Sequence, residues 1–375
     1  MKLSFYQLAT VLIVTSLGSC SPQQSNQEES TEEQSARPST IELLAGNATG
    51  IHLLNFDPSN GSISKVGFLV EARSPSYFQI SDDRQYVYSV NEGKDGGASS
   101  FKWNRDSSRL ELLSQQPSNG DYPCYVDIDA SEKMMAVGNY GTGNIAIYTI
   151  NDDHQLQPPA MRQHEGSGPQ PSQNGPRAHC ARFKGDFMYA VDLGIDKILS
   201  YPVNGDMTVG EAKVAIAMDP GDGPRHLIFH PTKDMAFAIN ELSSTIVSMK
   251  ANYTNGTFER IDKASTLPDD FTEKNSCADI HITPDGKFLY GSNRGHNSIA
   301  IFAVSEEGML TSLGQEPVRG SWPRNFTLSP DGNYLIVANR RSNNIVVFKI
   351  DRATGLLAYT GNEVELEGTA CLKFN

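Results

Sequence analysis

The feature that most constrains the fold of this chain is a sequence pattern that returns about every fifty residues. A run rich in β-branched and aromatic residues ends in asparagine or aspartate, and successive endings are 44 to 53 residues apart. These endings are Asn47, Asn91, Asn139, Asp192, Asn240, Asn293 and Asn339. A repeat of this length with several short strands is typical of β-propeller blades, so seven endings predict an all-β, seven-bladed propeller.

Each unit also has a regular interior. A proline lies sixteen residues before most of the endings, and Cys277 takes that place in the sixth unit. The prolines are Pro75, Pro123, Pro176, Pro224 and Pro323. Turns such as "TPDG" (283–286) and "SPDG" (329–332) join the first apolar strand to the second, because Asp-Gly suits a hairpin reversal. No stretch shows a long helical period.

The two ends of the chain predict how the ring closes. The position sixteen residues before Asn47 is Thr31, inside an acidic and polar segment, so the first unit lacks its opening strand. The C-terminal "GTACLKF" (368–374) has the pattern of "GPRHLIF" (223–229) but no unit of its own. We therefore expect this last strand to pair with the first blade, which closes the ring and removes two exposed sheet edges.

The N-terminal residues predict export. Residues 1–20 contain Lys2, a short apolar run and the ending "LGSC", which resembles a bacterial lipoprotein signal that is lipidated at Cys20. An ordinary signal peptide is the alternative. Residues 21–40 are rich in Gln, Ser and Glu and predict a disordered tether before the propeller of residues 41–375. The protein is then exported and lipid-anchored on the periplasmic or outer side of a bacterial membrane.

Charge and cysteine content narrow the possible partners. A net charge of −13 argues against nucleic acid, and it leaves the lipid anchor as the expected membrane contact. No C-x-x-C pair occurs, so we expect no structural zinc site. The sequence offers no other clear set of metal ligands, and we expect no metal and no cofactor. We interpret the four cysteines after the signal as small buried residues of strands, although four allow three disulfide pairings. A monomer with a small anionic substrate is expected.

Residues that depart from the repeat are the candidates for function, because the repeat itself specifies only blades. The opening strand of a blade lies nearest the propeller axis, so the ends of these strands face one mouth of the central channel. We expect Arg225, Arg294, His179 and His226 to gather there and to receive a small anion or an anionic transition state. Three further arginines, which we interpret as bridges between neighbouring blades, are Arg177, Arg324 and Arg340.

Several stretches match motifs of one known family. They are "PSYFQISDDRQYVYSVNE" (75–92), "HEGSGP" (164–169), "GPRAHC" (175–180), "GPRH" (223–226), "NELSS" (240–244), "ADIHITPDGKFLYGSNRGH" (278–296) and "NRRSNNIVVFKID" (339–351). On these stretches the chain resembles the propeller-type lactonases over nearly all of residues 41–375. That family includes seven-bladed 6-phosphogluconolactonases and a related fungal carboxymuconate cyclase.

The resemblance also implies site residues. The family's functional arginines and glutamate fall in the "GPRH", "NEL" and "NRG" stretches, and its active-site histidine falls in "AHC". The catalytic residues implied here are His179, Arg225, Glu241 and Arg294. Substrate-binding roles are expected for His164, Glu165, His226 and His281.

Lactone hydrolysis needs a base to activate water, a positive charge to hold the oxyanion, and an acid for the leaving alkoxide. Glu241 or His179 can act as base and acid, while Arg225 and Arg294 stabilise the oxyanion and any anionic group of the substrate. The reaction then opens a sugar lactone to its acid without a metal. Two alternatives are a cycloisomerase acting on a muconate-like diacid and a non-enzymatic propeller that only binds a ligand.

Overall fold

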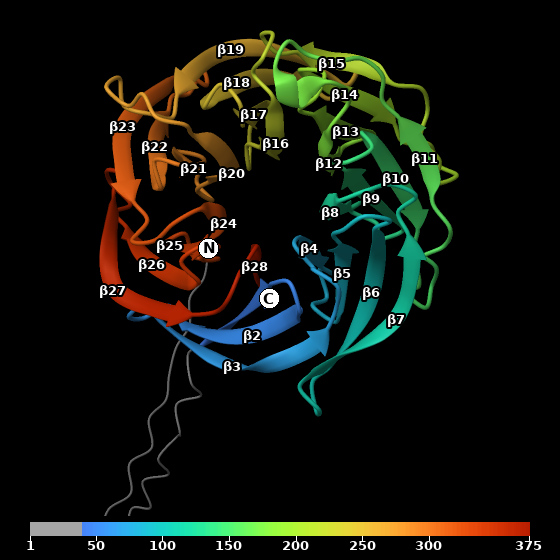
Figure 1. Ribbon diagram of the computed structural model, residues 1–375, viewed down its shortest axis with the longest axis horizontal. Helices are drawn as coiled ribbons and strands as arrows, with labels where there is room; N and C mark the ends of the chain where they lie inside the picture. Colours follow the sequence, from blue (N-terminus) through green and yellow to red (C-terminus); the bar gives the residue numbers. More distant parts are fainter. Residues whose placement is uncertain (1–39) are drawn as a thin grey trace, which may run out of the picture. The chain divides into compact units, whose positions relative to one another are not determined.

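The computed structural model describes residues 40–375, and their strands form seven four-stranded antiparallel sheets arranged in a ring (Figure 1). The predicted seven-bladed propeller is therefore confirmed. The only helix in this part of the chain is the single 3-10 turn η1 (Pro171–Gln173). The predicted signal peptide with Cys20 and nearly all of the tether lie outside the described residues, so they stay predictions. No helix within residues 40–375 is long and apolar enough to cross a membrane.

Each blade uses its innermost strand to line the propeller axis (Figure 1). In blades one to seven these strands are β28 (Cys371–Phe374), β4 (Phe78–Ile80), β8 (Pro123–Ile128), β12 (Ala178–Lys184), β16 (Pro224–Phe229), β20 (Ser276–Ile282) and β24 (Pro323–Leu328). The second strands are β1 (Ile41–Gly46), β5 (Tyr86–Asn91), β9 (Met134–Asn139), β13 (Phe187–Asp192), β17 (Met235–Asn240), β21 (Phe288–Arg294) and β25 (Tyr334–Asn339).

The outer half of each blade consists of the third and fourth strands, which lie toward the periphery. The third strands are β2 (Gly50–Asp57), β6 (Gly97–Asn104), β10 (Asn144–Thr149), β14 (Lys197–Pro202), β18 (Thr245–Asn252), β22 (Ser298–Val304) and β26 (Asn344–Ile350). The outermost strands are β3 (Ser62–Glu71), β7 (Arg109–Pro117), β11 (Ala160–Gln163), β15 (Lys213–Ala217), β19 (Thr257–Ser265), β23 (Leu310–Pro317) and β27 (Leu357–Glu365).

Ring closure occurs as the sequence predicts. The C-terminal strand β28 pairs antiparallel with β1, with Cys371 opposite Gly46 and Phe374 opposite Leu43. The first blade thus combines three strands from the start of the propeller with one from its end. The inner edge of β1 is thereby paired.

The repeated asparagine holds neighbouring blades together. In blade three, Asn139 Nδ2 donates to the carbonyl of Ser118, which follows the outermost strand of blade two, at 3.0 Å. Equivalent bonds join Asn293 to Thr266 and Asn339 to Val318. A buried backbone carbonyl without a partner is costly, so each of these contacts satisfies a group that the outermost strand leaves unpaired. This requirement explains why asparagine recurs at the end of the second strand.

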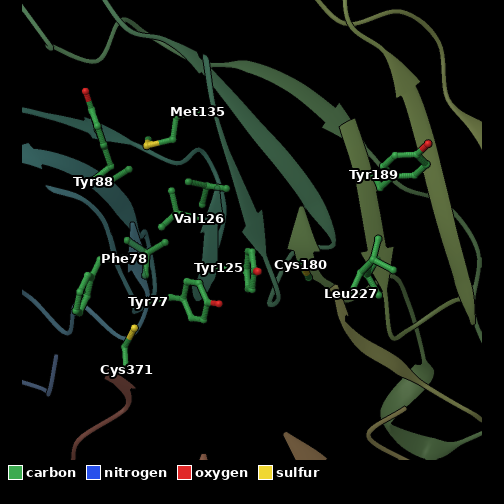
Figure 2. Packing of buried hydrophobic residues seen from close by; sticks show 14 of the residues in the cluster. Tyr77, Phe78, Tyr88, Tyr125, Val126, Met135, Cys180, Tyr189, Leu227 and Cys371 are labelled. Carbon is green, nitrogen blue, oxygen red and sulfur yellow. The ribbon is translucent and has the colours of Figure 1, made fainter. Parts of the chain in front are cut away.

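The hydrophobic core lies between blades, where the face of one sheet packs on the face of the next. Large aromatic and aliphatic side chains fill this space, as Figure 2 shows for residues of blades one to five. The rings of Tyr77 and Tyr125 stack with centroids 4.1 Å apart, close to the axis. All four cysteines of the propeller are buried, free and located in strands, as the sequence analysis proposes.

Candidate active site

β-Bulges change the direction of four side chains on the inner strands. The pairing register shifts between Pro123 and Tyr125, and similar shifts occur in β12, β16 and β24. A bulge inserts one extra residue and turns its side chain in a new direction. The residues within the four register shifts are Cys124, His179, Arg225 and Arg324.

The pairing register differs in one blade from the pattern of a proline sixteen residues before the repeated asparagine or aspartate. In blade five Pro224 lies opposite Asn240, but in blade four the residue opposite Asp192 is Ala178, not Pro176. The hairpin between β12 and β13 is two residues shorter, and Pro176 precedes the strand. His179 therefore occupies the place that Arg225 holds in blade five.

Three of these residues, Cys124, His179 and Arg324, meet residues at or just after the ends of the second strands. Together they line a cavity of about 200 Å³. Its lining consists of Glu92, Cys124, Tyr140, His179, Glu241, Arg294 and Arg324. Three of the four predicted catalytic residues belong to this set, and they come from blades four, five and six. The cavity is small, so it suits a compact ligand.

Glu241 is held by two arginines. Arg294 Nη2 lies 2.8 Å and Arg225 Nε lies 3.1 Å from the same carboxylate oxygen, Oε2. The Arg225 contact is an ion pair without the alignment of a hydrogen bond. No hydrogen bond to Oε1 of Glu241 occurs within residues 40–375, which leaves this oxygen as an acceptor for a substrate or water.

The two arginines are not equivalent. Arg294 lines the cavity and donates a further bond of 2.8 Å to the carbonyl of Cys277. Arg225 is only 2% exposed and does not line this cavity, so it contacts Glu241 from the interior of the protein. Burial and the nearby charge of Arg294 lower the pKa of Arg225 to about 10, although Glu241 opposes this effect.

His226 is buried beneath the cavity and both of its ring nitrogens have partners. Nδ1 lies 2.8 Å from Asp279 Oδ1, and Nε2 accepts a hydrogen bond of 3.0 Å from Arg225 Nη1. Burial and the charge of Arg225 lower its pKa to about 3, so the ring is neutral at neutral pH. The predicted role of His226 in substrate binding stays untested, but these contacts favour a role in holding Arg225.

A layer of buried side chains, joined by ring contacts and hydrogen bonds, lies near the axis beneath the cavity. Its members, contributed by the innermost strands and the residue before β4, are Tyr77, Tyr125, His226, Asp279 and Asn325. His281 lies two residues further along β20 and contacts Asp279 Oδ2 through Nε2 at 3.2 Å. The structure thus places His281 outside the cavity lining, and its predicted contact with substrate is not favoured by this position.

His179 lies in the cavity lining beside other aromatic rings. Its ring contacts Tyr140 and His226 edge to face, and Nδ1 is 3.6 Å from the Cys124 sulfur. Burial and then the charge of Arg225 hold the pKa of His179 well below its usual value. A neutral imidazole with such a low pKa is a poor base, but it can donate a hydrogen bond through the nitrogen that carries its proton.

The lowered pKa of His179 predicts a pH-dependent stability. Below about pH 6.5 a histidine of the unfolded chain binds a proton, whereas His179 of the folded protein stays neutral. The free energy of unfolding should therefore fall as the pH drops from 7 toward 4. A His179→Gln variant lacks this proton uptake on unfolding. Near pH 5 its free energy of unfolding should therefore change less steeply with pH than that of the wild type, by about 1.4 kcal/mol per pH unit. Denaturant titrations across this range test the expectation, and equal slopes in both proteins would contradict it.

His164 belongs to the contact between blades three and four. It follows β11 directly, and its Nδ1 lies 2.6 Å from Asp192 Oδ2. Asp192 replaces the repeated asparagine, so this pair makes the inter-blade contact with the donor and acceptor exchanged. Glu165, the next residue, is exposed. Neither residue lines the cavity, and their predicted contact with substrate has no support from their positions.

Two charged residues of the lining, Glu92 and Arg324, were not among the site residues expected from the sequence. Glu92 and Arg324 form an ion pair with Nη2 and Oε2 3.2 Å apart. Arg324 was interpreted as a bridge between blades, and it does connect residues of blades two and seven, but it also faces the cavity. The signal that could have found Glu92 is its place one residue after Asn91, which matches the place of Glu241 after Asn240.

Metal ligands are not clustered in the part of the chain that the structure describes. No group of three or more His, Cys, Asp or Glu side chains among residues 40–375 is arranged to hold a metal ion.

Comparison with known proteins identifies the family. Residues 39–374 match the family described as "Lactonase, 7-bladed beta-propeller". The chain is 32% identical to a 6-phosphogluconolactonase of Bacillus subtilis, over 88% of this chain and 95% of that protein. It is 34% identical to a 6-phosphogluconolactonase of Formosa agariphila, over 87% and 95%. The chain belongs to the seven-bladed β-propeller lactonases, which confirms the resemblance seen in the sequence.

Solved structures agree with this placement. A periplasmic gluconolactonase of Pseudomonas aeruginosa superposes with a TM-score of 0.84 at 29% identity, covering 90% of this chain and 99% of that one. A protein of Bacteroides fragilis, described as a putative 6-phosphogluconolactonase, gives 0.83 at 34% identity, with coverage of 90% and 98%. The likeness extends over the whole ring and is not limited to a few blades.

Proposed function

We propose that this protein hydrolyses a sugar lactone to the corresponding acid at the channel mouth, with Glu241 as the general base. The observation that carries this assignment is the contact of Arg225 and Arg294 with a single oxygen of Glu241. That arrangement fixes the carboxylate at the edge of a small cavity and keeps its other oxygen available. The two 6-phosphogluconolactonases and the gluconolactonase among the similar proteins support this class of reaction.

The first step adds water to the lactone carbonyl. Glu241 Oε1 takes a proton from a water molecule, and the water oxygen forms a bond to the carbonyl carbon as the C=O electron pair moves to the oxygen. Arg294, which lines the cavity, stabilises the resulting oxyanion. Losing one donor of this kind typically costs about 2.7–4 kcal/mol of transition-state stabilisation.

The second step opens the ring. The oxyanion re-forms the C=O bond, the bond to the ring oxygen breaks, and protonated Glu241 gives its proton to the leaving oxygen. His179 donates a hydrogen bond from its neutral ring, since its low pKa disfavours a role as base. The sequence analysis left Glu241 and His179 as equal candidates for the base, and the environments of the two side chains favour Glu241.

The same cavity was also considered for a cycloisomerase and for a non-enzymatic binding propeller. Both alternatives are less favoured, because the similar proteins with named activities are lactonases. The metal-free reaction proposed here rests on general acid–base chemistry and on charge stabilisation by arginine.

A lactone panel tests this proposal. The purified protein should open glucono-1,5-lactone well above the spontaneous rate, measured as proton release at constant pH. The rate should not change in the presence of EDTA. A simple lactone without hydroxyl groups should react more slowly, because it lacks groups for the polar cavity. Failure to accelerate the opening of any lactone in the panel would contradict the proposed function.

A further inference from the structure

A second charged pair faces the cavity from the side opposite Glu241. Glu92 follows β5 in blade two, and Arg324 occupies the bulge of β24 in blade seven. They reach each other across blade one, which contributes the small side chain of Ala370 near the axis. The side chains of Glu92 and Arg324 are 20% and 14% exposed, so both still present polar atoms to a ligand.

The order of the blades gives the cavity two chemical ends. His179, Glu241 and Arg294 come from the adjacent blades four, five and six. Glu92 and Arg324 come from blades two and seven, across the ring from blades four and five (Figure 1). A ligand whose reactive bond lies at Glu241 therefore extends its remote end toward Glu92 and Arg324.

The groups at this remote end suit hydroxyls better than an anion. A hydroxyl group both donates and accepts, so it can donate to the Glu92 carboxylate while a neighbouring hydroxyl accepts from the Arg324 guanidinium. A phosphate has only acceptors at neutral pH and is held best by arginines that are free to bind it with two bonds. Each arginine in the lining is already paired with a glutamate, and the carboxylate of Glu92 repels a dianion.

We infer that Glu92 and Arg324 form a second subsite, which binds the hydroxyl groups at the end of the substrate remote from the lactone bond. This subsite selects an unphosphorylated sugar lactone over a phosphorylated one. The inference rests on the proposed lactone hydrolysis and adds the substrate class and a residue that determines it. Glu92 is the selective element, since its charge is the feature that disfavours phosphate.

Arg340 is a second cation near this subsite that could help to bind a phosphate. It is half-buried next to Glu92 and Arg324, and burial together with the charge of Arg324 lowers its pKa. It does not line the cavity, so it offers no direct contact to a ligand there while Glu92 and Arg324 are paired. If Glu92 loses its charge, Arg324 becomes free to bind a phosphate with Arg340 behind it.

The test compares glucono-1,5-lactone with its 6-phosphate in the full-length protein. The wild type should show a kcat/KM at least about tenfold higher for the unphosphorylated lactone. In Glu92→Gln, which keeps the shape and removes the charge, this ratio should fall at least about tenfold, mainly through KM for the phosphorylated lactone. The control is Glu306→Gln, which removes an exposed carboxylate paired with Lys233 and should leave the ratio unchanged.

A binding measurement separates this inference from the proposed hydrolysis. Calorimetry with gluconate and 6-phosphogluconate needs no turnover, and it should show the same preference and the same change in Glu92→Gln. If no lactone is hydrolysed but this binding pattern appears, the reaction is wrong and the subsite stands. If wild type prefers the phosphorylated compounds, or if Glu92→Gln leaves both ratios unchanged, the subsite is wrong.

Discussion

Removal of residues 368–375 should unfold the whole propeller and not merely loosen one end. The deleted segment supplies β28, whose Cys371 and Leu372 are fully buried, and whose Phe374 packs on Phe56 with ring centroids 5.5 Å apart. Its backbone pairs along all of β28 with β1. Loss of one large buried side chain costs about 2–5 kcal/mol, and domains are stable by only about 5–15 kcal/mol.

The deletion also reaches the layer beneath the cavity. The amide of Leu372 donates to Asn325 Oδ1 at 2.7 Å, and Asn325 in turn contacts Asp279. Thermal melting followed by circular dichroism should show a single transition lowered by well over ten degrees, or no folded protein at all. A Leu372→Ala variant serves as the graded control and should melt between the two. A truncated protein that melts like the wild type would show that β28 does not close the ring.

The architecture could be predicted from the sequence because it repeats. The asparagine that ends the second strand makes the same inter-blade contact in several blades. One physical requirement therefore makes the same residue recur along the sequence. The exception, Asp192, appeared as a departure from the pattern. The structure shows that His164 compensates for it, and only the spatial contact between the two residues reveals this.

The site was predictable in part. Arg225, Glu241 and Arg294 are charged residues at fixed places of the repeat, and the structure brings them together. The position of a side chain along the propeller axis, which decides whether it reaches the cavity, could not be predicted in the same way. His281 lies only two residues beyond Asp279 and contacts its carboxylate, yet it is not part of the cavity lining. Pro176 stands sixteen residues before Asp192, as the repeat predicts, but Ala178 is the residue that pairs with Asp192. The spacing in the sequence therefore could not show that the hairpin between β12 and β13 is two residues shorter than the one in blade five.

A Glu241→Gln variant should lose most of its lactone hydrolysis while it keeps its fold. The substitution preserves the shape of the side chain but removes the carboxylate that takes the proton from water. General-base catalysis contributes about 10²–10⁴-fold, so we expect kcat to fall within this range. Arg225 is buried beside Glu241 and loses its nearest counter-charge, so a modest decrease in melting temperature is also expected.

A matched control separates loss of the base from loss of charge in general. Glu316→Gln removes another paired carboxylate, bound to Arg319 at 2.7 Å on the outermost strand of blade six. This variant should retain the wild-type rate. Comparison of the two at equal folded concentration removes any effect of stability on the measured rate.

The most direct test of the channel mouth as the catalytic site is therefore the rate of glucono-1,5-lactone opening by folded Glu241→Gln relative to wild type and to Glu316→Gln. The geometry around Glu241 predicts that kcat of Glu241→Gln is at least about a hundredfold lower, while Glu316→Gln is unchanged. A folded Glu241→Gln protein with the wild-type kcat would contradict the assignment of catalysis to this cavity.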